Sequence, residues 1–495
     1  MPLVLQPVQI KQDNIALILL AVLLAGFAWL ASISTGTQGG EDSFMHYLFA
    51  RYVPQHPQNL LDHWGKPLFT LLATPFAQWG FTGAKIYNCL AGILSAWFTY
   101  KTADRLGMKT ALASIILLLF APMYFLSLNS SLTEITFSLV LIAGFYYIVA
   151  DRFYIAAIIL SFLPFARTEG FILLPVIGLY FIWQKKYIQL LLLGLGLVVY
   201  SLIGYFYHYH DILWVFTQNP YAGKTGVYGK SDNFWHFADG YRDIIGDPQK
   251  WLFIIGFVSF LFRLNRASKT GIENTDNIFK YWLLIVLCVV AYFMAHSIVW
   301  YYGIQGSAGL LRVMAGILPL LALISTRGLE AIYTPFQINK NFRLALVFTI
   351  LFYVVEYPTI RYDLPVQLGP EETLLYEAGT WYKNSEYKKP DTKVYYFAPT
   401  VAIAFEIDPF DPHQRAYLHD AKRSNEVPTG SIIVYDMHFG PNECEFPLEE
   451  IQSNPDYELL KHFVPKNPFK TMGDAEYEIY VFRKRGTQTG LNRQN

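Results

Sequence analysis

The sequence predicts a mostly helical protein that crosses a membrane many times and ends in a small α/β domain outside it. Of the 495 residues, 53% are hydrophobic and only 15% are charged, whereas soluble domains carry roughly 25% charged residues. The first apolar run, residues 14–34, has about the 20 residues that a helix needs to cross a bilayer. The last part, residues 359–495, is charged and alternates short β-like and helical runs, a pattern typical of an α/β domain. The β-like runs are residues 393–398, 431–436, 459–464 and 478–483, and the helical runs are 371–384 and 448–453.

Composition also excludes several classes of protein. The net charge is zero, which argues against a general nucleic-acid binder. Two of the three cysteines, Cys89 and Cys288, lie in apolar runs, and Cys444 lies far away in a polar region. This spacing indicates neither a disulfide framework nor a metal cluster. Only Lys11 precedes the first apolar run as a basic residue, and that run is too long for a signal peptide, so we expect an anchor.

Apolar segments recur along the first three quarters of the chain and predict about eleven spans, with ten to thirteen compatible with the pattern. Residues 67–81 form a further short segment, but its prolines and glycine make a lipid-facing span improbable. The expected spans are residues 15–34, 84–104, 110–128, 131–150, 153–166, 170–184, 187–207, 251–264, 281–300, 307–326 and 342–358.

Lysines and arginines in the short loops predict the orientation. With the N-terminus in the cytoplasm, every compact basic cluster falls on the cytoplasmic side, as in Lys101–Lys109 and Lys185–Lys186. The expected organisation is then a transmembrane domain, residues 1–358, with two long outer loops, 35–83 and 208–250. Residues 359–495 form a soluble domain outside the cytoplasm, at a plasma or inner membrane.

The first outer loop opens with two adjacent carboxylates, Glu41 and Asp42. In a helix Asp42 shares a face with His46, four residues later, so an acid lies beside an imidazole. The pair could instead only cap a helix in a solvated loop.

Three ionisable residues interrupt apolar sequence on the same side of the membrane, where a charge requires a partner or a polar cavity. Arg167 and Glu169 lie between two apolar runs and could simply form a solvated hairpin tip. Arg312 lies in the first turn of an apolar segment, where snorkelling alone could satisfy it. Its guanidinium also suits the oxygens of a phosphate. An ion pair between Arg312 and Glu169 is a third possibility.

The two outer loops offer further candidates. Asp62, His63 and His46 could bind a divalent metal, although scattered histidines usually bind none. In the second loop, Lys224 and Tyr228 have the chemistry for phosphate neutralisation and sugar stacking, but an aromatic belt at the interface has the same composition.

Common motifs of nucleotide and hydrolase chemistry are missing from the sequence. It contains no GxxxxGK[ST], no strand-led GxGxxG, no serine-hydrolase elbow and no HExxH. An enzyme that faces outward without a nucleotide site needs an activated donor that reaches it through the lipid.

Several stretches, in the order in which they occur, resemble the GT-C class of integral-membrane glycosyltransferases over roughly residues 14–358. They are the acidic stretch from Glu41 to Arg51, Lys66-Pro67-Leu68-Phe69, the 91–107 span, Arg167-Thr168-Glu169-Gly170, and the Arg312 to Pro319 helix. The stretch around Arg167 is similar to the class's R-x-E-G sequence. In the acidic stretch, Phe44 and Met45 depart from the class's pattern, because many members have small or acidic residues at these positions.

This resemblance implies a sugar transferase of hexosyl or mannosyl type that uses a polyprenyl-phosphate-linked donor. Its acceptor would be a lipid, a glycan or a protein. Asp42, with Glu41 as the alternate, would be the catalytic base, and Arg312, Arg167 and Lys224 would hold the lipid phosphate. Two other readings remain open from the residues alone: a polytopic transporter, and a non-catalytic cell-envelope assembly protein.

Overall fold

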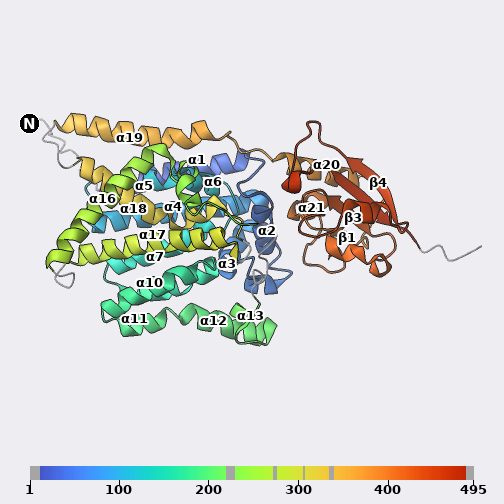
Figure 1. Cartoon of the computed structure of the whole chain (residues 1–495), viewed down its shortest axis with the longest axis horizontal. Coiled ribbons are helices and arrows are strands. Elements are labelled where there is room, and N and C mark those ends of the chain that lie inside the picture. Colours follow the sequence, from blue (N-terminus) through green and yellow to red (C-terminus); the bar gives the residue numbers. More distant parts are fainter. Residues whose placement is uncertain (1–11, 219–228, 271–275, 305–306, 334–338, 487–495) are drawn as a thin grey trace, which may run out of the picture. The chain divides into compact units, whose positions relative to one another are not determined.

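The computed structural model describes residues 12–218, 229–270, 276–304, 307–333 and 339–486 (Figure 1). The chain divides into two compact units, and each is discontinuous in sequence. The helical unit comprises Met1–Gln38 and Gln58–Val366, and the second unit comprises Gly39–Pro57 and Gln367–Asn495. A segment of the first expected outer loop therefore belongs to the same unit as the C-terminal part of the chain.

Helices build the first unit. The longer ones are α1 (Gln12–Ile33), α3 (Pro67–Ala77), α4 (Gly80–Arg105), α7 (Glu134–Val149), α10 (Gly170–Trp183), α12 (Leu195–Gly204), α16 (Gly246–Thr270), α17 (Asn277–Tyr302), α18 (Leu318–Tyr333) and α19 (Lys340–Arg361). The shorter ones are α5 (Ala113–Leu119), α6 (Pro122–Leu128), α8 (Phe153–Ser161), α9 (Leu163–Ala166), α11 (Tyr187–Leu192), α13 (Trp214–Thr217), α14 (His236–Asp239), α15 (Tyr241–Ile244) and 3-10 helices at Pro57–Leu61 and Leu311–Ile317.

Five helical stretches of the described chain are long and apolar enough to cross a membrane. They are Gln12–Ile33, Tyr187–Tyr209, Asn277–Tyr302, Leu311–Tyr333 and Asn341–Arg361. Other expected spans are shorter or interrupted: the 110–128 segment is two short helices, α5 and α6, because Pro122 begins a new helix. The helical bundle is confirmed, and the count of eleven spans stays a prediction.

Helix α7 occupies the middle of this unit, where it packs against α4, α8 and the 3-10 helix Leu311–Ile317. Nearly all of its residues are buried. The loop before it is fixed from α4, because the Asn88 side-chain amide donates to the carbonyls of Ser130 (2.8 Å) and Leu132 (2.9 Å). These bonds hold the amino end of α7, where Glu134 begins the helix.

A five-stranded mixed sheet forms the centre of the second unit. Its elements are α2 (Gly40–Arg51), α20 (Pro370–Lys383), β1 (Val394–Tyr396), α21 (Pro399–Phe405), β2 (Arg415–Tyr417), β3 (Ile432–Asp436), α22 (Leu448–Gln452), β4 (Tyr457–Phe463) and β5 (Ile479–Lys484), with 3-10 helices at Leu418–Lys422, Ser424–Glu426 and Met472–Asp474. The strand order is β2-β1-β3-β5-β4. Strands β1, β2 and β3 are parallel, with Val394 opposite both Arg415 and Ile432, whereas β5 is antiparallel to β3 and β4.

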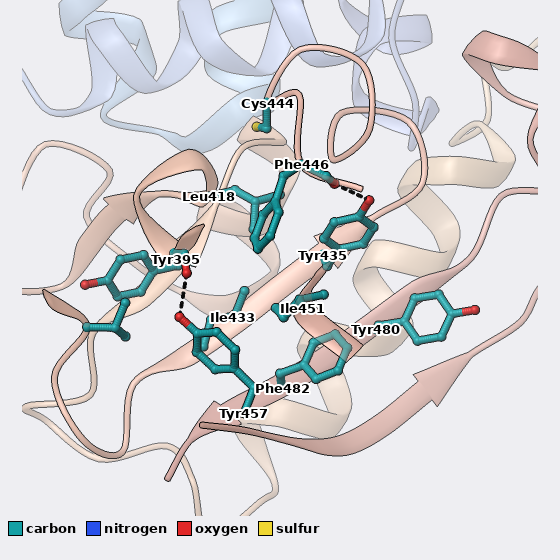
Figure 2. Close-up of a cluster of buried hydrophobic side chains, with 12 residues drawn as sticks. Tyr395, Leu418, Ile433, Tyr435, Cys444, Phe446, Ile451, Tyr457, Tyr480 and Phe482 are labelled. Carbon is teal, nitrogen blue, oxygen red and sulfur yellow. Dashed lines mark hydrogen bonds between the residues drawn. The ribbon is translucent and has the colours of Figure 1, made fainter. Parts of the chain in front are cut away.

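One face of this sheet carries an aromatic core (Figure 2). Two of its tyrosine hydroxyls are satisfied within the core: Tyr435 donates to the Phe446 carbonyl and Tyr457 to the Ala421 carbonyl, each at 2.6 Å. Such bonds remove the cost of burying a phenol. The sequence predicted four of the five strands and the helices α20 and α22. It did not predict β2 or α21, which have three and seven residues.

Candidate functional site

Four charged side chains meet at the amino end of α7, and we call them the arginine cluster: Glu134, Arg167, Glu169 and Arg312. The Arg167 guanidinium lies 2.8 Å from Glu134 and 2.6 Å from Glu169. The Arg312 Nε lies 3.6 Å from the same Glu134 oxygen. Glu134 is 1% exposed and therefore lies between two arginines away from water.

The backbone around Arg167 positions this residue. Helix α9 ends at Ala166, and α10 begins at Gly170, so Arg167 and Glu169 lie in the turn between two helices. A Cβ at position 170 would lie 2.5 Å from the nitrogen of Pro164, so only glycine permits this close approach. The turn presents Arg167 to both carboxylates, and its Nη1 also donates to the Thr133 hydroxyl at 2.9 Å.

Arg312 lies in the 3-10 helix that precedes α18, rather than in the first turn of an α-helix. The Tyr292 hydroxyl of α17 fixes this segment by donating to the Val313 carbonyl at 3.0 Å. The expected alternative, an ion pair between Arg312 and Glu169, is not the pairing that these distances describe: Glu134 is the carboxylate beside Arg312, and Glu169 binds Arg167.

Two further groups surround the arginine cluster. Glu169 lies within electrostatic range of Lys66 and of His296. Three basic side chains, Arg167, Arg312 and Lys66, therefore lie near the two carboxylates. Nε2 of His296 is buried and has no hydrogen-bond partner among the described residues. Buried guanidinium groups and an imidazole nitrogen without a partner have the chemistry to bind an anion and a hydroxyl.

Asp42, Glu41 and His46 lie on α2, in the second unit. As expected, Asp42 and His46 are four residues apart on one helix. Glu41 is bound to Thr400: the Thr400 backbone N–H donates to one carboxylate oxygen at 2.7 Å and its hydroxyl donates to the other at 2.6 Å. Burial raises the pKa of Glu41 to about 8, and nearby Glu372 and Asp436 act in the same direction.

The remaining candidates have no common site in the structure. Lys224 and Tyr228 lie outside the described residues. Asp62 accepts from the Gly65 backbone at 2.7 Å and so closes the turn before α3, and His63 is 3.4 Å from the Trp214 carbonyl. Across the described ranges, no group of three or more His, Cys, Asp or Glu side chains is arranged to hold a metal ion.

Sequence reasoning did not identify Glu134, Lys66 or His296 as members of a site. One signal was present, because Glu134 is the only acid in an apolar run of about twenty residues and such a residue needs a partner. The partners come from positions 33 and 178 residues further along the chain, a distance that local patterns do not cover.

The architecture is that of known membrane proteins. It is similar to the crystal structure of ArnT from Cupriavidus metallidurans in the apo state, with a TM-score of 0.60 and 13% identity over 95% of this chain and 98% of that one. The same ArnT bound to undecaprenyl phosphate gives a TM-score of 0.59 and 11% identity over the same shares. An Archaeoglobus fulgidus oligosaccharyltransferase, tethered with an acceptor peptide, gives a TM-score of 0.50 and 12% identity over 85% of this chain and 69% of that one.

No protein-family model and no curated protein matches the sequence. The structural likeness establishes the fold: the chain is an integral membrane protein with the GT-C fold, as the resemblance in sequence predicted.

Proposed function

We propose that the protein is a membrane glycosyltransferase that moves a sugar, of hexosyl or mannosyl type, from a polyprenyl phosphate to an acceptor. The observation that carries this proposal is the pair of buried guanidinium groups, Arg167 and Arg312, in a GT-C fold. One structure of similar fold is bound to undecaprenyl phosphate. Arginine suits a phosphate because its planar fork can donate two parallel hydrogen bonds.

The reaction assigns a role to each group. An acceptor hydroxyl or amine attacks the anomeric carbon of the sugar, and the bond from that carbon to the phosphate oxygen breaks. Asp42 takes the acceptor proton, and a positioned base of this kind contributes about 10²–10⁴-fold in rate. The lipid phosphate leaves with the bonding electrons, and Arg312 and Arg167 stabilise its charge.

Substitution of the base tests this proposal. Asp42→Asn keeps the shape of the side chain but cannot take a proton, so we expect transfer from a polyprenyl-phosphate sugar to fall by at least about 10²-fold. Asp232→Asn, an exposed acid of the second outer loop, is the matched control and should leave transfer unchanged. Normal turnover of Asp42→Asn in a correctly inserted protein would contradict the assignment.

A further inference from the structure

The three parallel strands of the second unit form a binding geometry of a known type. From β1 the chain passes to β2 on one side, and β3 then pairs on the other side of β1. Open α/β sheets bind their ligands at such a switch point, just beyond the carboxyl ends of the strands. Here this position lies between the loop after β1, which leads into α21, and the loop that follows Asp436, the last residue of β3.

A side chain of the protein itself occupies this position. Glu41 binds the first turn of α21 through the Thr400 N–H and hydroxyl, 359 residues away in sequence. Asp436, at the end of β3, lies within electrostatic range of it. A carboxyl group at a helix amino terminus satisfies a free N–H group. Glu41 thus lies where open α/β sheets bind a ligand.

Two glycines with positive φ angles precede Glu41. Gly39 and Gly40, immediately before Glu41, have φ angles of 84° and 48°, which favour glycine. A Cβ at position 40 would also lie 3.1 Å from a carboxylate oxygen of Glu372 on α20. The turn therefore brings the first residues of α2 against the C-terminal part of its unit.

We propose that Glu41 is a positioning residue, whose carboxylate anchors the helix that carries Asp42 to the switch point of the C-terminal sheet. The inference rests on the proposed function only for the role of Asp42. Because both Glu41 oxygens accept hydrogen bonds from Thr400, Glu41 serves the reaction through the placement of α2 rather than by taking the acceptor proton. The C-terminal part of the chain then acts as a support for the catalytic helix.

Hydrogen exchange tests the anchor without reference to activity. Thr400→Val removes the hydroxyl donor and keeps the backbone donor, so we expect the α2 amides of the full-length protein to exchange about tenfold faster or more. Thr400→Ser should restore the wild-type rate. Thr471→Val is the matched control, because Thr471 donates to Glu371 at 2.6 Å and has no part in the anchor. Unchanged α2 exchange in Thr400→Val would overturn the proposal.

Activity measurements distinguish a positioning role of Glu41 from a role as the catalytic base. If Glu41 anchors α2, Glu41→Gln and Thr400→Val should each lower kcat, and the double variant should be little worse than the more severe single variant. If Glu41→Gln abolishes transfer while Thr400→Val leaves it intact, Glu41 is the base and the anchor is wrong. If Asp42→Asn remains active while the exchange results hold, the anchor stands and the proposed base falls.

Discussion

Glu134 shows how one residue can define a charged site. It begins α7 and is nearly inaccessible to water, so its charge requires compensation, and Arg167 and Arg312 provide it. Glu169 pairs with Arg167 as well, so the two arginines and two carboxylates of the cluster balance in formal charge. On the proposed function, the same two guanidinium groups hold the lipid phosphate. Variants can separate this role from their contribution to stability.

Arg312→Ala should weaken donor binding more than it affects folding. A hydrogen bond to a charged group contributes about 1.5–3 kcal/mol, so we expect the KM for the lipid-linked donor to rise about 10–100-fold. Arg312→Lys should recover only part of the lost donor affinity, because lysine keeps the charge but loses the planar fork of the guanidinium. Arg242→Ala, an exposed arginine, is the control. A variant with a normal KM that melts far below the wild type would make Arg312 structural.

Glu134→Gln should destabilise the protein by about 3–5 kcal/mol, because removal of one partner leaves buried arginines uncompensated. The double variant Glu134→Gln/Arg312→Gln restores the charge balance, so it should recover part of the stability that the single variant loses. Thermal melting in detergent measures both effects. If the single variant melts like the wild type, or the double variant is the less stable of the two, the ion pair does not carry the stability assigned to it.

At the scale of elements, the sequence predicted what depends on local pattern. Hydrophobic runs located the helices of the bundle, and alternating patterns located β1, β3, β4 and β5. Arg167 and Glu169 interrupt two apolar runs in the sequence, and the structure has a turn between two helices there. Local pattern could not show that 39–57 belongs to the C-terminal unit, because that depends on contacts such as Glu41 with Thr400. Nor could it show that Glu134, rather than Glu169, is beside Arg312.

Buried acids in the second unit predict a pH dependence of its stability. Burial raises the pKa of Asp436 from 3.8 to about 6, and that of Glu41 to about 8. The folded state therefore holds these protons at pH values where the unfolded state has released them. The stability that these two groups contribute is fully present below about pH 4. It is lost as pH rises through about 4–6 for Asp436 and about 4–8 for Glu41, by up to about 1.4 kcal/mol per pH unit for each group.

Proteolysis of the second unit at a series of temperatures, at pH 5 and at pH 8, measures this dependence. We expect residues 367–486 to resist cleavage better at pH 5. Asp436→Asn removes one buried charge while it can still accept from the His438 and Phe439 amides, so it should reduce the difference between the two pH values. Equal resistance of the wild type at both values would contradict the pKa assignment.

For the whole molecule, the basic loops predict which side of the membrane each unit faces. With the N-terminus in the cytoplasm, an odd number of spans places residues 367–495 outside. A reporter that is active only outside the cytoplasm, fused at the C-terminus, should therefore be active. A fusion at the N-terminus serves as the control and should be active only with a cytoplasmic reporter. The opposite result at the C-terminus would reverse the topology.

The discontinuity of the second unit also imposes an order on biosynthesis. Residues 58–366 separate its two parts, so the ribosome must add 309 residues after Pro57 before the rest of the unit begins. At about 5–20 residues per second this takes about 15–60 s. During that interval α2 has already been synthesised, whereas Thr400, β1 and β3 have not. On the proposed roles, a nascent or truncated chain already contains the base and both arginines but cannot yet hold the base in place. The protein would become active only when its last quarter has been translated and folded.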